Sequence, residues 1–297
     1  MIEFPISGVE TYFWLPALVA FLVTSITSTA GVGGGFIFLP FQVSILGFTT
    51  PGVSATNLLI NVLTIPSGAA RYHAEKRLLW PLALLMIIFA LPGVILGAYM
   101  RVTFLPDPTN FKLFVGIVLL ILSVRLVGDM FRSRRNKEAG KAIQSFRIES
   151  AEFGFRELRF DFNGEQYRLS TLKPAILSLV VGVIGGLYGI GGGVILAPYL
   201  VTAYSLPVFA VAGAVLVTTF ATSVGGVLAY LIIANIDPSG SAAMPDFWLG
   251  LSFGVGGAAG MYLGARLQRF FPAKLIKGIL FVTIVAIALK YIYGFFA

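Results

Sequence analysis

The sequence predicts an all-α integral membrane protein made of two inverted-topology repeats, and three observations support this fold class. Of the 297 residues, 57% are apolar and only 11% are charged, whereas soluble domains have about 45–50% apolar and about 25% charged residues. Long apolar stretches recur along the chain, and the two halves carry the same motifs in the same order. This composition excludes a soluble enzyme, a disordered protein and a coiled coil.

The apolar segments are of two lengths. A bilayer core about 30 Å thick needs about 20 helical residues. Segments of roughly that length are predicted as full helices at 11–30, 53–70, 79–100, 111–130, 172–190, 207–234, 247–265 and 275–296. Two shorter segments, at 36–47 and 194–205, are interpreted as half-helices, re-entrant segments or thinned crossings. Each repeat then has about four full helices and one short discontinuous segment.

Residues 131–171 interrupt this pattern and are expected to form a soluble insert at the membrane surface. Basic residues open the insert, and apolar and polar residues then alternate over 153–169. Asn163 and Gly164 stand in the middle of the alternating run, and both residue types tolerate the positive φ angles of a tight turn. We therefore predict a small β-hairpin, which regulates the membrane part, binds a partner or only links the repeats.

The internal repeat is visible in two motifs. A Gly-rich motif, G-x-G-G-G-x-x-x-x-P, occurs at 31–40 and again at 189–198, with six of ten positions identical. A second motif, G-x-x-L-G-A, occurs at 93–98 and at 260–265. The small-residue spacing in these later glycines predicts helix-packing faces rather than binding sites. The predicted organisation is membrane repeat 1 (1–130), a cytoplasmic linker with the hairpin (131–171) and membrane repeat 2 (172–297).

The charged residues predict that the repeats are inverted. The loop near 71–78 is basic, whereas the equivalent loop at 235–246 carries Asp237 and Asp246 and no Lys or Arg. After the next helix the signs exchange, since 266–277 is basic and 101–112 is mixed. Because basic loops stay in the cytoplasm, equivalent loops lie on opposite sides. We expect a multi-pass protein of the plasma (inner) membrane with 131–171 in the cytoplasm and both termini outside.

The two Gly-rich motifs are the main candidate site. Four glycines in five residues disfavour a helix, and broken backbone at membrane depth must be buried in protein or line a watery cavity. A helix that begins after such a break directs N–H groups and partial positive charge at its start, which suits an anion. The alternative is that glycine only allows close helix packing. Neither motif fits a phosphate-binding P-loop or a dinucleotide-binding fingerprint.

Polar side chains in neighbouring helices complete the candidate site. Amide and hydroxyl donors can bind a small oxyanion without a buried fixed charge, although hydrogen bonding between helices explains each of them equally well. The predicted substrate-binding residues are Gly31, Gly33, Gly34, Gly35, Asn57, Asn61, Gly189, Gly191, Gly192, Gly193, Thr218, Thr222 and Ser223.

Residue types that are missing from the sequence argue against metal, cation and catalytic sites. There is no cysteine and only one histidine, and no acidic residue falls in the interior of a predicted span, where a cation site or proton relay would need one. We therefore predict no metal site, no cofactor and no catalytic residues. The basic residues cluster in loops, so the expected partners are the lipid bilayer and a small anionic substrate, not nucleic acid. The oligomeric state is left open.

The paired G-x-G-G-G-x-x-x-x-P motifs, together with the later L-G-A motifs, resemble the TauE/SafE sulfite exporter family. The resemblance covers roughly 11–130 and 172–296 and leaves out the insert. It implies a secondary carrier of sulfur-containing anions such as sulfite or organosulfonates, with the two Gly-rich motifs and their prolines, Pro40 and Pro198, as the carried-over positions. It does not fix the substrate. The alternatives are a cation-coupled carrier of another small solute or metal ion and, outside transport, an intramembrane scaffold or enzyme.

Overall fold

A computed structural model describes residues 1–28, 33–74, 78–132, 148–153, 157–162, 165–204, 208–236, 242–267 and 273–296, most of them helical. The helices are α1 (Leu15–Thr27), α2 (Gly35–Ser44), α3 (Gly52–Ala74), α4 (Trp80–Thr103), α5 (Pro108–Arg132), α6 (Leu172–Tyr188), α7 (Gly193–Tyr204), α8 (Val208–Ile236), α9 (Phe247–Leu267) and α10 (Ala273–Phe296). Each predicted helical segment contains a helix, although the ends differ by a few residues and two helices, α1 and α6, are shorter than predicted. The structure is therefore nearly all-α, as expected.

Helices α1 and α6 are shorter than predicted. α1 has 13 residues because Val9–Thr11 belongs to a strand and Pro16 lies in its first turn. α6 has 17 residues and ends at Gly189, which adopts a left-handed φ of 87°, the usual helix stop for glycine. At about 1.5 Å per residue, α1 extends about 20 Å, so the prediction of a full-length helix over 11–30 is wrong.

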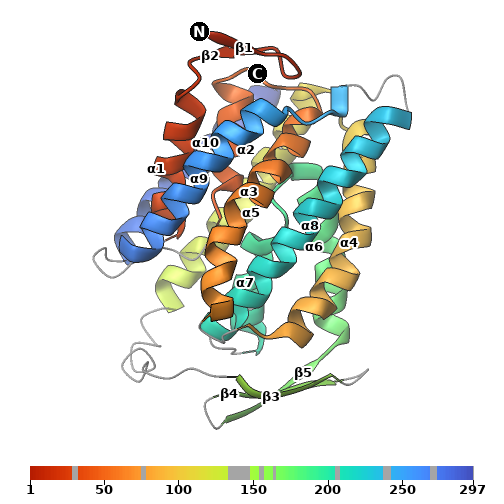
Figure 1. Cartoon of the computed structure of the whole chain (residues 1–297), viewed down its shortest axis with the longest axis vertical. Coiled ribbons are helices and arrows are strands. Elements are labelled where there is room, and N and C mark those ends of the chain that lie inside the picture. The colour runs from red at the N-terminus through yellow and green to blue at the C-terminus, as the bar shows by residue number, and fades with distance from the viewer. Residues whose placement is uncertain are drawn as a thin grey trace.

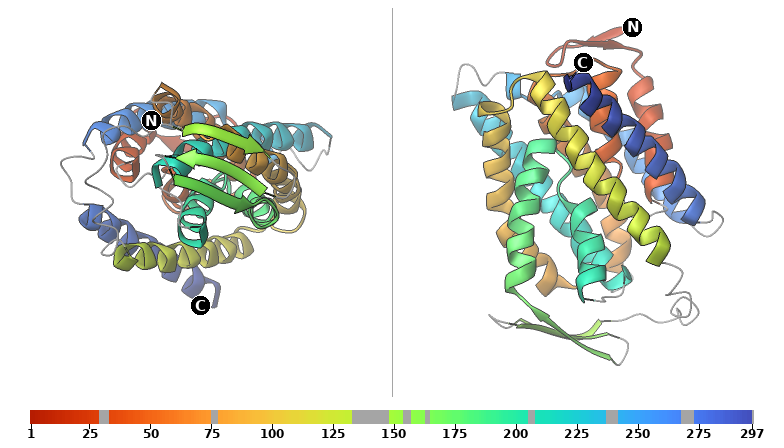
Figure 2. Two further views of the ribbon diagram at one scale, coloured as in Figure 1. Left: turned by 90° about the horizontal axis from the view of Figure 1, so that it is seen from below. Right: turned by 180° about the vertical axis from the view of Figure 1, so that it is seen from behind.

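The short helices α2 and α7 return toward the end from which their preceding helix came. They have 10 and 12 residues, or about 15 and 18 Å, so neither crosses a core about 30 Å thick. In Figure 1, α1 descends from the end that holds both termini and α2 lies back near that end, whereas α7 lies near the opposite end. Figure 2 shows α6 and α7 side by side above the sheet at that opposite end.

Glycine allows the closest helix contacts. α4 packs along α6, and α1 packs along α9. A Cβ at Gly93 or Gly97 would collide with the backbone of α6, and a Cβ at Gly256, Gly260 or Gly264 would collide with backbone or side-chain atoms of α1. These glycines are the helix-packing faces that the sequence predicted. Further contacts join α3 to α8 and α9, α4 to α8, and α5 to α10.

The insert contains one more strand than predicted. β3 (Ile148–Phe153), β4 (Glu157–Phe162) and β5 (Glu165–Ser170) form an antiparallel sheet in that order. The β4–β5 pair, in which Phe162 faces Glu165, confirms the predicted hairpin. Asn163 and Gly164 lie outside the described residues. Figure 1 places the sheet beyond the helix ends, opposite both termini.

A second hairpin at the N-terminus was not predicted. Strands β1 (Ile2–Phe4) and β2 (Val9–Thr11) pair antiparallel. The carboxylate of Asp246 accepts hydrogen bonds from the Ser7 backbone N–H at 2.9 Å and hydroxyl at 2.8 Å, and from Leu249 N at 3.0 Å. Asp246 thus caps α9 and holds this hairpin against the bundle. The local sequence, with only three residues per strand, gives too weak a pattern to predict it.

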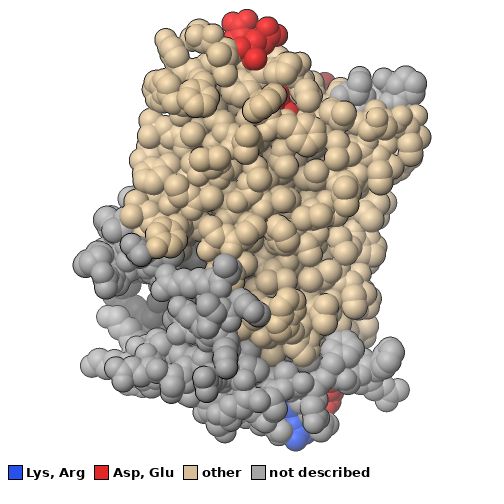
Figure 3. Space-filling view, in the orientation of Figure 1, with Lys and Arg blue, Asp and Glu red and all other residues tan. Residues whose placement is uncertain are grey.

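The described helical wall is apolar. In Figure 3 the wall facing the viewer is uncharged, and the coloured acidic and basic side chains lie at the two ends. Many large apolar side chains point outward, among them Leu84, Ile88 and Ile232. Among the described residues, Trp80–Thr103 and Gly213–Ile236 are each long and apolar enough to cross a membrane unaided.

Candidate functional site

The two Gly-rich breaks meet in the middle of the bundle, and one amide joins them. Asn57 lies on α3 and is fully buried. Its Nδ2 donates to the carbonyl of Gly35 at 2.8 Å and to the carbonyl of Gly189 at 3.0 Å. Both of its N–H donors are therefore used, so in this conformation Asn57 fastens the breaks together and has no donor left for a ligand.

Asn61, one turn further along α3, has one amide N–H without a partner among the described residues. Its Nδ2 donates to the Gly189 carbonyl at 3.4 Å. A Cβ on Gly35 would lie only 3.1 Å from Asn61 Oδ1, so the amide packs directly on the first turn of α2. A primary amide has two N–H donors. Asn61 is consequently the better of the two predicted asparagines for contact with a substrate.

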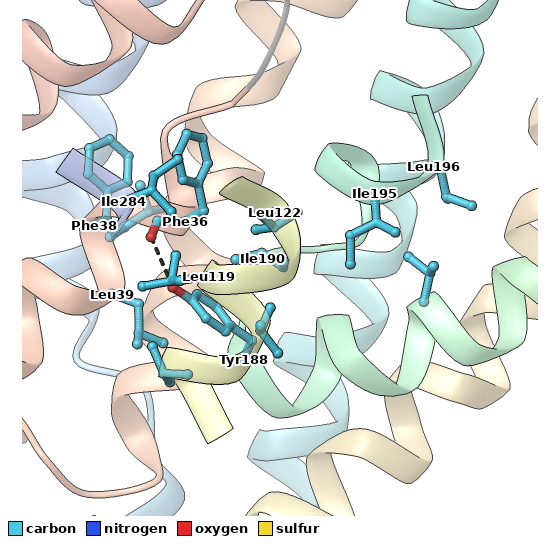
Figure 4. Packing of buried hydrophobic residues seen from close by; sticks show 14 of the residues in the cluster. Phe36, Phe38, Leu39, Leu119, Leu122, Tyr188, Ile190, Ile195, Leu196 and Ile284 are labelled. Carbon is cyan, nitrogen blue, oxygen red and sulfur yellow. Dashed lines mark hydrogen bonds between the residues drawn. The ribbon is translucent and has the colours of Figure 1, made fainter. Parts of the chain in front are cut away.

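The proline of the first motif has a partner from the second break. Pro40 lies inside α2 and has no N–H to donate to the carbonyl of Phe36, four residues earlier. The hydroxyl of Tyr188, at the end of α6, donates to that carbonyl at 2.9 Å. Figure 4 shows this bond within the apolar cluster that surrounds the breaks, with Leu39, Leu119 and Ile190 alongside it. Buried backbone acceptors need a partner, so the bond is a second link between the two halves.

The second break has a strained backbone lined by hydroxyls. Gly189, Gly191 and Gly192 have φ angles of 87°, 67° and 82°, which other residues rarely adopt. On α8, Thr222 Oγ1 lies 3.1 Å from the Gly191 carbonyl, and a Cβ on Gly191 would lie 2.8 Å from Ser223 Oγ. Ser223 is fully buried, and its hydroxyl has no hydrogen-bond partner among the described residues.

The structure brings most, but not all, of the predicted residues together. Asn57, Asn61, Thr222 and Ser223 contact the breaks. Thr218 does not, since its hydroxyl donates within α8 to Ala214 at 2.9 Å and faces the Ala83 carbonyl of α4 at 3.4 Å. Gly31 lies outside the described residues. The predicted glycines that the structure describes in or beside the breaks are Gly33, Gly34, Gly35, Gly189, Gly191, Gly192 and Gly193.

Three side chains at the breaks were not among the predicted site residues. Thr219 lies against Gly191 and Gly193, Tyr188 bonds Phe36, and Gln42 donates to Asn57 Oδ1 at 3.4 Å while its own Oε1 has no partner among the described residues. A polar Gln within the apolar segment 36–47 was a signal that could have identified Gln42. Tyr188 carried no such signal, because a tyrosine at the end of an apolar helix fits the membrane interface equally well.

A helix N-terminus follows each of the joined breaks. α2 begins beside Gly35 and α7 begins at Gly193, and both starts contact residues of the joined breaks. The first N–H groups of a helix have no partner within the helix and carry partial positive charge. Hydroxyls and amides surround them, and Asp129, in the last turn of α5, is the one acidic residue within the described helices. This arrangement can bind a small anion.

The comparisons with known proteins agree with this architecture. Residues 16–291 match the family described as sulfite exporter TauE/SafE. The chain is 25% identical over 291 residues to the Bacillus subtilis protein named "Probable membrane transporter protein YunE", covering 95% of this chain and 97% of that protein. It is 26% identical over 275 residues to "Probable membrane transporter protein YdhB" of the same organism, covering 90% and 94%.

A further relative is longer than this chain. "Probable membrane transporter protein MamO" of Paramagnetospirillum magneticum is 25% identical over 271 residues, which are 87% of this chain and 41% of that protein. No solved structure matches the chain. The family match spans both Gly-rich breaks and nearly all the described helices, so this chain belongs to the TauE/SafE sulfite exporter family of membrane transporters and is not an enzyme.

Proposed function

We propose that this protein is a secondary transporter that exports small sulfur-containing anions, such as sulfite or organosulfonates, by alternating access. The observation that carries the proposal is the meeting of the two breaks, fastened by Asn57 to Gly35 and Gly189. A short helix begins directly after each joined break, at Gly35 and at Gly193, as in transporters whose half-helix N-termini point at an anionic group of the substrate.

The helix contacts support an inverted repeat, an arrangement that many alternating-access transporters share. If every helix of the first half is exchanged for its counterpart five positions later, the contact of α4 with α6 becomes that of α9 with α1. The contact of α3 with α9 likewise becomes that of α8 with α4, and α5 with α10 becomes itself. We infer that the halves are related by a two-fold axis in the membrane plane and exchange conformations to open each end in turn.

The charge distribution supports a cytoplasmic sheet. Helices α5 and α9 end away from both termini (Figure 1), and the sequence that follows each of these helix ends is basic. Since basic loops remain in the cytoplasm, we propose that the sheet faces the cytoplasm and that the termini are external.

The anion preference rests on the donors at the breaks. Amide, hydroxyl and backbone N–H groups can bind an oxyanion, and the described helices offer no carboxylate there. A coupled cation or a metal cargo would need such a carboxylate or another oxygen cage. The alternative is a cation-coupled carrier, and the flux measurement below distinguishes it from an anion exporter.

The proposal is tested with the purified protein in liposomes. Sulfite, sulfate, thiosulfate, methanesulfonate and sulfoacetate are supplied in turn, and flux is compared with empty liposomes and with the Gly191→Leu variant. Flux of sulfite or a sulfonate that the variant lacks supports the proposal. Flux of none of these anions, or flux only of a neutral solute or a cation, contradicts it.

The driving force is tested in the same liposomes. An interior-negative potential contributes about 2.3 kcal/mol per elementary charge per 100 mV, so an anion uniporter exports without a cation gradient. With the potential set by potassium and valinomycin, we expect anion flux to follow the potential in the absence of sodium and proton gradients. Flux that requires one of those gradients and ignores the potential would reject uniport.

A further inference from the structure

A buried arginine lies at the end of the bundle that holds the termini. Arg101 is in the last turn of α4, and its side chain is 0% exposed. From the sequence, Arg101 is expected in the mixed-charge loop 101–112. In the structure it lies inside the protein, because α4 continues to Thr103. Burying a charge costs several kcal/mol unless a partner of opposite charge compensates it.

The contacts of Arg101 occupy only part of its guanidinium. Nη1 donates to the carbonyl of Leu105. The ring of Phe111 lies against the flat face, with its centroid 3.6 Å from Cζ. Nη2 reaches the carbonyl of Thr49 at 3.5 Å, the limit of a hydrogen bond, and Nε has no partner among the described residues.

Two acidic side chains, Asp107 and Asp246, already accept hydrogen bonds from other groups. Asp107 accepts hydrogen bonds from the N–H groups of Thr109 and Asn110 at 2.9 Å and so caps α5. Asp246 caps α9 and holds Ser7. No ion pair joins Arg101 to a carboxylate among the described residues, so the positive charge is buried there without a counter-charge.

We propose that Arg101 is an anion-binding residue at the termini end, which holds the oxyanion on its passage between the breaks and the outside. This inference rests on the proposed transport of anions, and it assigns to Arg101 the binding of the anion at the termini end. Nε and Nη2 form the side edge of a guanidinium, a planar pair of donors that fits two oxygens of a sulfite or sulfonate group. Thr49 and Leu105 belong to the loops that close this end.

Buried polar groups connect Arg101 with the second break. Tyr230 on α8 lies in the same buried cluster as Ala98 of α4, and its hydroxyl donates to the Gly186 carbonyl at 2.8 Å. Ser54 on α3 donates to the Leu187 carbonyl at 2.8 Å. Both carbonyls belong to the last turn of α6, next to Gly189. Tyr230 also interacts electrostatically with Arg101, so buried polar groups extend from the arginine to the last turn of α6.

Three variants of the full chain test the proposal. Arg101→Gln removes the charge, Arg101→Lys keeps the charge without the two-donor edge, and Lys112→Gln removes a half-buried charge at the same end as a control. The dissociation constants of sulfite and methanesulfonate are measured at constant ionic strength, together with the melting temperature and liposome flux. We expect Arg101→Gln to weaken binding about tenfold to hundredfold and Arg101→Lys about threefold to tenfold, and Lys112→Gln to change it less than about twofold.

The outcomes separate this proposal from the transport proposal. Unchanged affinity in a folded Arg101→Gln variant, with flux intact, overturns the role of Arg101 and leaves transport standing. Weakened binding in Arg101→Gln, with wild-type protein that binds sulfite but does not move it, supports Arg101 and rejects transport. If Arg101→Gln does not fold, Arg101→Lys decides: weaker binding at an unchanged melting temperature supports the proposal, and unchanged binding overturns it. A wild-type protein that binds no oxyanion overturns both.

Discussion

The two Gly-rich breaks share a sequence motif but differ in backbone and in surroundings. Gly34, before α2, has a φ of −77°, whereas its counterpart Gly192, before α7, has a φ of 82°. Amides of α3 line the first break, and hydroxyls of α8 line the second. The shared motif therefore determines that the helix is interrupted in each half. The neighbouring helices determine which polar side chains contact each break.

The largest expected effect is at Gly191, compared with Gly33 at the equivalent position. Gly191→Ala forces a positive φ on alanine and places a Cβ 2.7 Å from Thr219 Cγ2, so we expect a loss of about 3 kcal/mol of stability and of most flux. Gly33→Ala adds a Cβ that has no atom of the described residues within 4 Å and is expected to be neutral. Melting temperature and flux are measured for both; equal losses would show that the two breaks are alike.

Asn57 is expected to have the next largest effect. Asn57→Leu removes the amide that joins the carbonyls of Gly35 and Gly189 and leaves the Gly189 carbonyl with only the longer bond from Asn61, at a cost of about 2 kcal/mol. The matched change on the other side, Thr222→Val, removes one hydroxyl near the Gly191 carbonyl and is expected to cost about 0.5–1 kcal/mol. Denaturation in detergent compares them. A larger loss in Thr222→Val would show that this contact within the second half stabilises the protein more than the Asn57 link between the halves.

Tyr188 provides a smaller, separate link. Tyr188→Phe removes the hydrogen bond to the Phe36 carbonyl, which Pro40 cannot supply, and we expect a loss of about 1 kcal/mol. Tyr293→Phe is the control, because Tyr293 is 75% exposed and its hydroxyl should contribute little. Thermal unfolding of both variants is the measurement. An unchanged melting temperature in Tyr188→Phe would mean that water or another donor reaches the carbonyl.

The smallest expected effect on stability comes from two single cysteine substitutions that report the orientation of the protein in the membrane. Ser170, at the end of β5, and Asn110, at the start of α5, are exposed, and the chain has no cysteine. Single Ser170→Cys and Asn110→Cys variants should transport normally. In intact cells we expect an impermeant thiol reagent to label Asn110→Cys and not Ser170→Cys, whereas the reverse pattern would invert the proposed orientation.

Some of the fold follows from local sequence. The ten helices, the β4–β5 hairpin and the helix-packing glycines were predictable because apolar segment length, turn residues and small-residue spacing act over a few residues or one helix. The shortness of α1 was not predicted, since Tyr12, Phe13 and Trp14 extend the apolar run toward the N-terminus, whereas the helix begins only at Leu15, after a strand that pairs with Ile2–Phe4. A strand that depends on a distant partner leaves little trace in its own residues.

The sequence alone determined that this protein is a helical membrane protein with a helix break in each half. Only the tertiary structure decided what those breaks and charges do: that Asn57 is used to join Gly35 and Gly189, that Thr218 faces α4, and that Arg101 is buried. The physical reason is that hydrogen bonds and burial depend on which helices meet. Asn57 and Gly189 are 132 positions apart in the chain, so no local pattern records their contact.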